Sequence, residues 1–153
     1  MKRAGLLLLA LMLLLLLASG VAIALTINCD GGRCRGTDSR DTMNGTRGRD
    51  NIFSRDGADL VRAKGGVDSV NGDGGKDRLS GGQGKDEVNG GDGDDLVAGN
   101  PGFDALTGGN GDDHMEAVDG MQDFITCGHG RHDLAVFDRG IDHLRDCEVR
   151  RPR

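Results

Sequence analysis

An apolar residue recurs at every ninth position through the middle of this chain, between residues 36 and 116. The nine residues are Met43, Ile52, Val61, Val70, Leu79, Val88, Val97, Leu106 and Met115. Most of the residues on either side of them are polar, which is typical of a short β-strand that buries one side chain. The pattern therefore predicts nine short strands separated by turns and stacked as a solenoid.

Two further positions of each nine-residue unit stay in the same register. The fourth residue is Gly in eight of the nine units, Ser39 being the exception, and the sixth is always Asp. The repeated acids are Asp41, Asp50, Asp59, Asp68, Asp77, Asp86, Asp95, Asp104 and Asp113. Glycine permits the backbone conformations of a tight turn. A solvated turn without any metal would also recruit Gly and Asp, but it does not explain why Asn or Ser never replaces Asp here.

These units resemble the haemolysin-type, or repeats-in-toxin (RTX), calcium-binding repeat, whose consensus is G-G-x-G-x-D-x-U-x, with U a large apolar residue. The resemblance covers residues 36–116. It implies an all-β fold, a right-handed parallel β-roll in which two units form one coil. It also implies that Ca²⁺ is bound between stacked turns. Because stacked carboxylates repel each other without a cation, we expect the chain to fold on binding Ca²⁺.

The candidate calcium ligands are the carboxylates of the nine Asp residues and carbonyl oxygens of the turns, since Ca²⁺ takes about six to eight oxygens of both kinds. The best-kept turns contain Gly75, Gly82, Gly84, Gly91, Gly93, Gly102, Gly109 and Gly111. Asp92 and Asn110, at the third position, would add side-chain oxygens. Units 2 to 4 instead place Arg47, Arg55 and Lys64 in their turns, so we expect weaker or empty sites there.

The first 24 residues differ from the rest of the chain. Met1-Lys2-Arg3 precedes an apolar stretch and then Ala22-Ile23-Ala24, which has small residues where a signal peptidase reads. This predicts a signal peptide at residues 1–24 and a secreted protein, with an uncleaved membrane anchor as the alternative. Loss of Lys2 and Arg3 would change the net charge from −6 to −8. Nucleic acid and anionic membranes are therefore poor partners, whereas Ca²⁺ is a suitable one.

Four cysteines flank the repeats in two pairs, and in an exported protein they predict disulfides. Of the three possible connectivities we favour Cys29–Cys34 with Cys127–Cys147, because each pair lies at one end of the repeats. A zinc site is the alternative, although the first pair has no neighbouring His. We expect residues 25–35 to form an N-terminal cap. Residues 117–153, where the repeat slips out of phase, should form a closing coil and C-terminal cap.

No catalytic motif accompanies the repeats, because neither H-E-x-x-H nor G-x-S-x-G occurs. A zinc site from His129, His132 and His143 is less expected than ordinary surface histidines. We therefore predict a non-enzymatic calcium-binding module, structural or adhesive, whose protein or cell-surface partner the sequence does not name. The alternative is an ice-binding or other surface-recognition solenoid. Outward-facing Asn and Thr are scattered among charges along the sequence, so no continuous flat row of them is expected.

Overall fold

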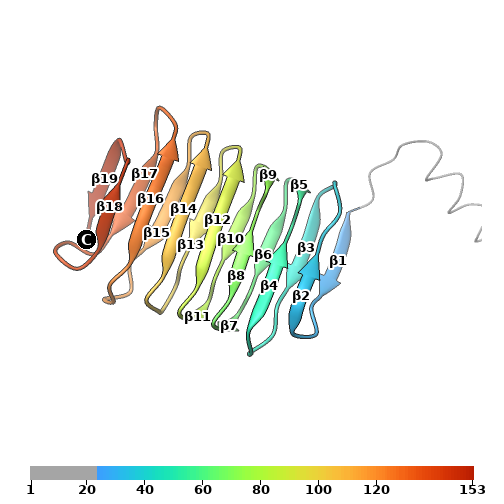
Figure 1. Cartoon of the computed structure of the whole chain (residues 1–153). Coiled ribbons are helices and arrows are strands. Elements are labelled where there is room, and N and C mark those ends of the chain that lie inside the picture. Colours follow the sequence, from blue (N-terminus) through green and yellow to red (C-terminus); the bar gives the residue numbers. More distant parts are fainter. Residues whose placement is uncertain (1–23) are drawn as a thin grey trace, which may run out of the picture.

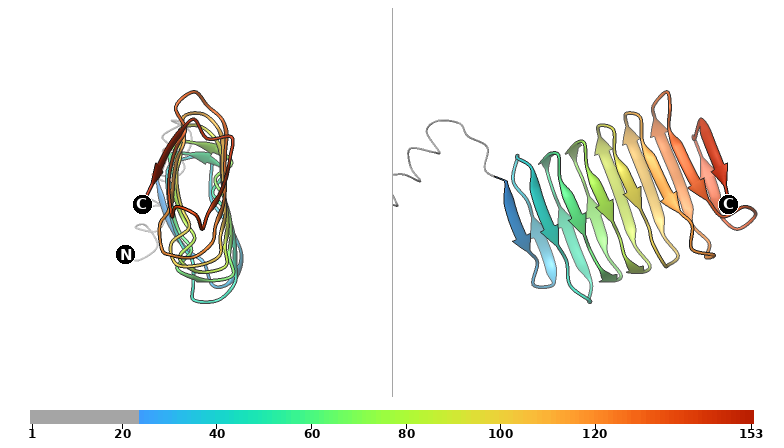
Figure 2. Two further views of the ribbon diagram at one scale, coloured as in Figure 1. Left: turned by 90° about the vertical axis from the view of Figure 1, so that its left-hand side faces the viewer. Right: turned by 180° about the vertical axis from the view of Figure 1, so that it is seen from behind.

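The computed structural model describes residues 24–153, which form a flattened roll of parallel strands (Figure 1). The predicted signal peptide lies outside the described residues except for Ala24. No helix long and apolar enough to cross a membrane occurs within the described part of the chain. Seen along the roll, successive coils superpose as a narrow oval with one sheet on each long side (Figure 2).

Two parallel sheets form the sides of the roll. Sheet A contains, in spatial order, β1 (Leu25–Asn28), β3 (Asp41–Asn44), β6 (Leu60–Arg62), β10 (Arg78–Ser80), β13 (Leu96–Ala98), β15 (His114–Ala117), β17 (Leu134–Phe137) and β19 (Val149–Pro152). Sheet B contains β2 (Gly32–Arg35), β4 (Asp50–Phe53), β8 (Ser69–Asn71), β12 (Glu87–Asp92), β14 (Ala105–Asn110), β16 (Phe124–His129) and β18 (His143–Arg145). Strands in sequence order alternate between the sheets, so two units form one coil and the predicted parallel β-roll is confirmed.

Short strands also link the turns of neighbouring coils. β5 (Asp56–Gly57) pairs with β9 (Gly74–Gly75), and β9 pairs in turn with β12. β7 (Gly65–Gly66) pairs with β11 (Gln83–Gly84) along the other edge. Backbone N–H and C=O groups of these turns are therefore largely bonded to the next coil, as buried backbone groups must be.

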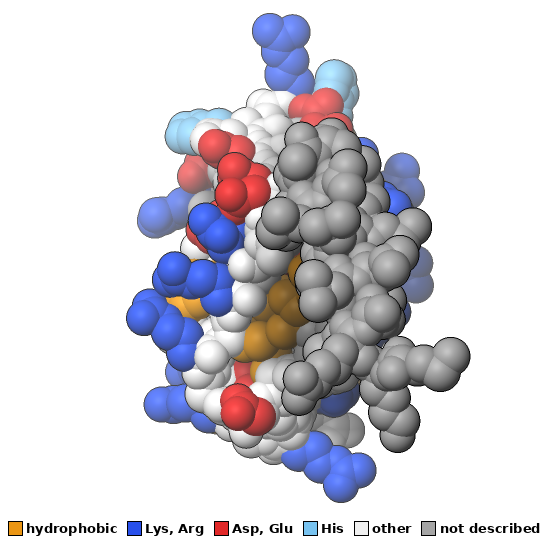
Figure 3. All heavy atoms as spheres, turned by 90° about the vertical axis from the view of Figure 1, so that its right-hand side faces the viewer, with side chains coloured by type: hydrophobic (Ala, Val, Ile, Leu, Met, Phe, Trp, Pro, Cys, Tyr) orange, Lys and Arg blue, Asp and Glu red, His pale blue; other side chains and the backbone are white. Residues whose placement is uncertain are grey.

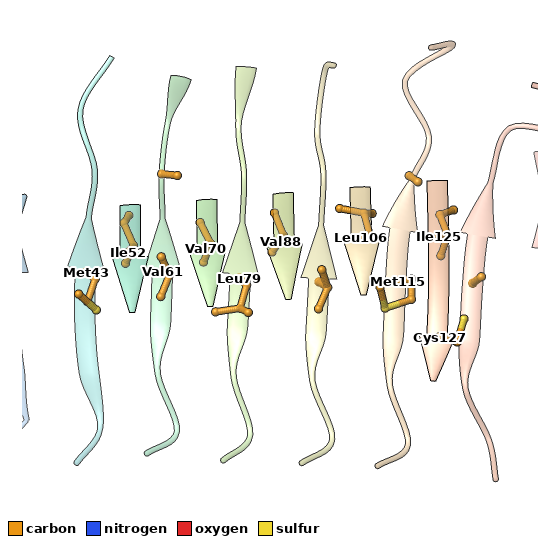
Figure 4. Packing of buried hydrophobic residues seen from close by; sticks show 14 of the residues in the cluster. Met43, Ile52, Val61, Val70, Leu79, Val88, Leu106, Met115, Ile125 and Cys127 are labelled. Carbon is orange, nitrogen blue, oxygen red and sulfur yellow. The ribbon is translucent and has the colours of Figure 1, made fainter. Parts of the chain in front are cut away.

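The repeated apolar position forms the core. Leu79 pairs with Val61 on one side and with Val97 on the other, a register of one coil, and all three side chains are buried. The side chains from the two sheets alternate along the interior as a single file (Figure 4). The strand pattern alone places them there, because only the middle residue of each three-residue strand points inward.

Coiling continues beyond both ends of the repeats. On the N-terminal side, Ile27 and Cys34 pair with Met43 and Ile52. On the C-terminal side, Ile125 pairs with Leu106, and Ala135 pairs with Met115. The extra residues of these last coils lie in turns. The buried apolar residues therefore stay in register on neighbouring strands, although the nine-residue period of the sequence is broken. The predicted disulfides Cys29–Cys34 and Cys127–Cys147 are both present.

The expectation that outward polar residues form no continuous row is wrong for sheet B. The last position of alternate units brings Asn71, Asn89, Thr107 and Thr126 into direct register on neighbouring strands. Asn89 Nδ2 donates to Asn71 Oδ1 over 3.1 Å. These residues are separated by intervening units in the sequence, and only the pairing of every second unit places them side by side.

Candidate metal centre

The repeated Asp residues lie inside the turns rather than on the surface. All nine are 0–3% exposed, and Asp123 and Asp133 beyond the repeats are equally buried. They form two columns, one along each edge of the roll. The first column is Asp41, Asp59, Asp77, Asp95, Asp113 and Asp133. The second column is Asp50, Asp68, Asp86, Asp104, Asp123 and Asp142.

Within each column one carboxylate oxygen holds two coils together. The backbone N–H of Asp77 donates to Oδ1 of Asp95 over 2.8 Å, and that of Asp86 donates to Oδ1 of Asp104 over 2.8 Å. The same bond recurs at each step of both columns. A carboxylate that accepts a backbone N–H makes a stronger bond than a neutral acceptor does. Repeated Asp therefore has a structural task in addition to any metal binding.

The second carboxylate oxygen is buried and has no partner. This holds for Oδ2 of nine successive acids: Asp59, Asp68, Asp77, Asp86, Asp95, Asp104, Asp113, Asp123 and Asp133. An acceptor that loses water without gaining a donor costs free energy, and an ionised one costs more. Such a series of orphaned anionic oxygens along both edges is the arrangement that a bound cation would satisfy.

Burial and mutual repulsion also act on the protonation of these acids. Burial, with the neighbouring carboxylates adding to it, raises the pKa of Asp77, Asp104 and Asp113 to about 7. For Asp68 and Asp123 the same causes, burial first, raise the pKa to about 6. Both effects disfavour the charged form, and a nearby cation would reverse them. Ionised carboxylates in the two columns are therefore unfavourable unless a cation binds beside them.

Backbone carbonyls surround each column because the turn glycines lack side chains. A Cβ on Gly75 would overlap the carbonyl oxygen of Gly57, and one on Gly93 would overlap that of Gly75. The other fourth-position candidates, Gly84, Gly102 and Gly111, meet the previous coil in the same way, as do Gly82, Gly91 and Gly109 at the second position. Carbonyl oxygens thus point along the roll from turn to turn, which is the hard-oxygen environment that Ca²⁺ prefers.

Asp92 and Asn110 lie elsewhere. Both side chains are exposed on the outside of the turn, and Asn110 Nδ2 donates to Asp92 Oδ1 over 2.7 Å. Within residues 24–153, no three side chains of His, Cys, Asp or Glu converge on one point. A site in this roll would therefore draw on carbonyl oxygens as well as on the columns of Asp.

Three acids beyond the repeats extend the columns, namely Asp123, Asp133 and Asp142. They accept the backbone N–H groups of Asp104, Asp113 and Asp123 over 2.8–3.0 Å. Asp133, rather than His132, takes the repeated place because one extra residue lies in the turn. Asp123-Phe124-Ile125 carries the D-x-U signal one residue late, whereas Asp133 is followed by the small Ala135 at the apolar position, and neither acid was predicted as a ligand.

The histidines do not assemble into the zinc site considered above. His132 is exposed, with Nδ1 3.1 Å from Oδ2 of Asp112. His143 stacks on Phe124, with ring centroids 5.1 Å apart. These contacts account for both side chains as surface residues.

Comparison with known protein families agrees with this geometry. The family model described as RTX calcium-binding nonapeptide repeat (4 copies) matches residues 35–70, 55–88, 62–97, 71–106 and 89–120. Together these segments span more than half of the 153 residues, and the chain belongs to this family. Searches of curated proteins and of solved structures found no match.

Proposed function

We propose that this protein is a secreted calcium-binding module whose roll completes its folding when Ca²⁺ fills the two columns. The buried, unpartnered Oδ2 atoms of nine successive acids are the main support. The ligands would be the repeated Asp residues from Asp77 onward, because Arg55 and Lys64 occupy the turns of units 3 and 4, with carbonyl oxygens of the glycine-rich turns. Bound Ca²⁺ would supply the positive charge that lets adjacent carboxylates stay ionised in a buried column.

The proposed role is structural or adhesive rather than enzymatic. Residues 1–24 would be removed on export, residues 25–35 and 117–153 would close the two ends, and residues 36–116 would bind calcium. Two disulfides fit an oxidising compartment. Affinity should be modest, with dissociation constants of about 10⁻⁴ to 10⁻³ M, as in extracellular modules. Calcium at that concentration would make the module rigid outside the cell and leave it incompletely folded inside.

Far-ultraviolet circular dichroism of residues 25–153 tests the proposal. In excess chelator the β signal should be weak, and adding Ca²⁺ should increase it cooperatively because neighbouring sites share turns. Mg²⁺ at the same concentration should do much less, since Mg²⁺ demands octahedral geometry and releases its water reluctantly. A full β signal in chelator, unchanged by Ca²⁺, would contradict the proposed function.

One observation favours surface recognition as a second candidate. Asn71, Asn89, Thr107 and Thr126 form a continuous polar row along the outside of sheet B, spaced by the strand separation. A single row with the charged Glu87 beside it is a limited surface. Thermal hysteresis of the calcium-loaded protein, compared with an Asn89→Lys variant, would detect ice binding through this row.

A further inference from the structure

The first turn of each column is closed by a threonine. In unit 1 the backbone N–H and Oγ1 of Thr37 donate to Oδ2 of Asp41 over 2.6 and 2.9 Å. In unit 2 Thr46 does the same to Oδ2 of Asp50, over 2.6 and 3.0 Å. In the turns that follow, this oxygen is the orphaned one. In these two turns the protein thus supplies two donors to the oxygen that has no partner in the acids from Asp59 to Asp133.

The backbone of these two turns also differs from the others. The second residue of every unit from 3 to 9 has positive φ, including Arg55 at 77° and Lys64 at 81°. Thr37 and Thr46 do not. A β-branched residue strongly disfavours positive φ. The threonine therefore fixes another turn conformation, in which its own N–H reaches the carboxylate.

Basic side chains of units 3 and 4 contact the turns of units 1 and 2. Lys64 Nζ donates to the carbonyl oxygen of Gly45, one coil earlier along the second edge. Along the first edge, Arg55 pairs with Asp38 at 3.1 Å. Further along the same edge, Lys76 of unit 5 pairs with Asp94 of unit 7 at 3.5 Å, and the side chains of both ion pairs are exposed. Lys64 and Arg55 thus each bring a positive charge to a turn one coil earlier.

The charge balance changes at the same boundary. Residues 36–71 contain six Lys or Arg and six Asp, a formal net charge of zero. Residues 72–116 contain three Lys or Arg and eleven Asp or Glu, a formal net charge of −8. In the view from the end where β1 to β4 lie, Lys and Arg side chains project from the visible outline of the roll, with Asp and Glu among them (Figure 3). Repulsion that opposes folding is therefore confined largely to the second part.

We propose that residues 36–71, together with β1 and β2, fold without calcium and serve as the template on which the acidic units order as Ca²⁺ binds. Only the calcium-dependent ordering of the acidic units rests on the proposed function, and the folding of residues 36–71 without calcium does not. Oδ1 of Asp41 accepts the N–H of Leu25 over 3.1 Å, so both oxygens of that carboxylate are satisfied by the protein. Oδ1 of Asp50 alone stays unpartnered in the two closed turns. Calcium-dependent ordering would run from the N-terminal to the C-terminal end.

Hydrogen exchange of the disulfide-bonded chain, residues 25–153, tests this order. In chelator we expect protected amides in β3, β4 and β6 and rapid exchange in β13, β14 and β15, with protection throughout after Ca²⁺ is added. Uniform exchange along the roll in chelator would overturn the inference. Calorimetric titration with Ca²⁺ separates the two proposals. If Ca²⁺ binds but exchange in chelator does not differ between the N-terminal and C-terminal strands, the template is refuted. If exchange differs between them but no Ca²⁺ binds, the proposed function is refuted.

A matched pair of variants isolates the threonine hydroxyls. Thr37→Val with Thr46→Val keeps the shape and β-branching but removes both Oγ1 donors. In chelator it should exchange at least about tenfold faster in β3 and β4, because each closed turn loses a hydrogen bond to a buried charged acceptor. The number of bound Ca²⁺ ions should stay unchanged. Thr42→Val on the outside of β3 is the control, and equal exchange in both proteins would refute the role of the hydroxyls.

Discussion

The backbone N–H of Asp77 donates to Oδ1 of Asp95, while Oδ2 of Asp95 is buried without a partner. One side chain thus joins two coils and leaves an anionic oxygen facing the turn. The roles of the two oxygens can be tested separately. Asparagine at position 95 keeps Oδ1 as an acceptor for the N–H of Asp77, but it removes the negative charge that would bind a cation. The following predictions use this distinction and the other local contacts of the roll.

Asp95→Asn should weaken calcium binding and leave the fold of the loaded protein intact. Asn Oδ1 can still accept the N–H of Asp77, but an amide replaces the anionic ligand. We expect one or two fewer bound ions and a rise of about tenfold in the calcium midpoint of folding, as for loss of a charged hydrogen-bond partner. Asp92→Asn in the same unit is the matched control, because the Asp92 side chain is exposed outside the columns and Asn Oδ1 can still accept from Asn110 Nδ2. Calorimetry and circular dichroism would measure both, and equal effects would contradict the assignment.

Lowering the pH should partly replace calcium. The pKa of Asp77, Asp104 and Asp113 is about 7 in the folded chain, against 3.8 for an ordinary Asp. Between these values the folded state holds protons that the unfolded state has lost, so stability without calcium falls as the pH rises through 7. In chelator the β signal should be stronger at pH 5 than at pH 8. The same protons compete with Ca²⁺, so calcium affinity should be lower at pH 5, and a pH-independent titration would refute the coupling.

Gly75→Ala should disrupt the stacking of turns. Gly75 has φ of 130°, and a Cβ there would overlap the carbonyl oxygen of Gly57 in the previous coil. We expect a loss of more than about 2 kcal/mol in the free energy of unfolding of the calcium-loaded protein. Gly48→Ala is the control, because its nearest atom would be 3.8 Å away and its φ is not positive. That variant should change stability by less than about 0.5 kcal/mol in urea denaturation.

Replacing Cys127 and Cys147 by Ala should destabilise the last coils more than the first. Their disulfide closes a sequence separation of 20 residues, whereas Cys29 and Cys34 are separated by 5. In the chain-entropy account the longer loop contributes about 3 kcal/mol. Limited proteolysis of the loaded variant should then cut first within residues 124–150. Cleavage first within residues 25–45 would contradict this expectation.

The nine-residue period predicted the strands and the buried ladder, and the resemblance to the calcium-binding repeat implied the pairing of every second unit. Met43 and Leu106 could be assigned to the core because only one position in nine is always apolar. The closing coils were harder to place. The turns accommodate an extra residue without disturbing the strands, but the insertion shifts Asp123 and Asp133 out of the nine-residue period. Both columns are therefore longer than the period alone predicts.

Two features depend on contacts that no linear pattern displays. The closure of Asp41 by Thr37 joins residues only four apart, but Thr is merely a polar exception to Gly at that position until the turn conformation is known. The polar row of Asn89 and Thr107 joins residues from units that are not adjacent in sequence. Both arise from three-dimensional pairing, which the repeat predicts in outline but not side chain by side chain.

Anomalous X-ray diffraction from crystals grown in Ca²⁺ tests the central claim most directly, because it locates the ions. The account predicts metal peaks in two rows along the edges of the roll, at about 2.3 to 2.6 Å from Oδ2 of Asp77, Asp95 and Asp113 in one row and of Asp86 and Asp104 in the other. The turns closed by Thr37 and Thr46 should contain none. Metal held instead by exposed acids such as Asp94 and Asp112, with the columns of buried carboxylates empty, would contradict it.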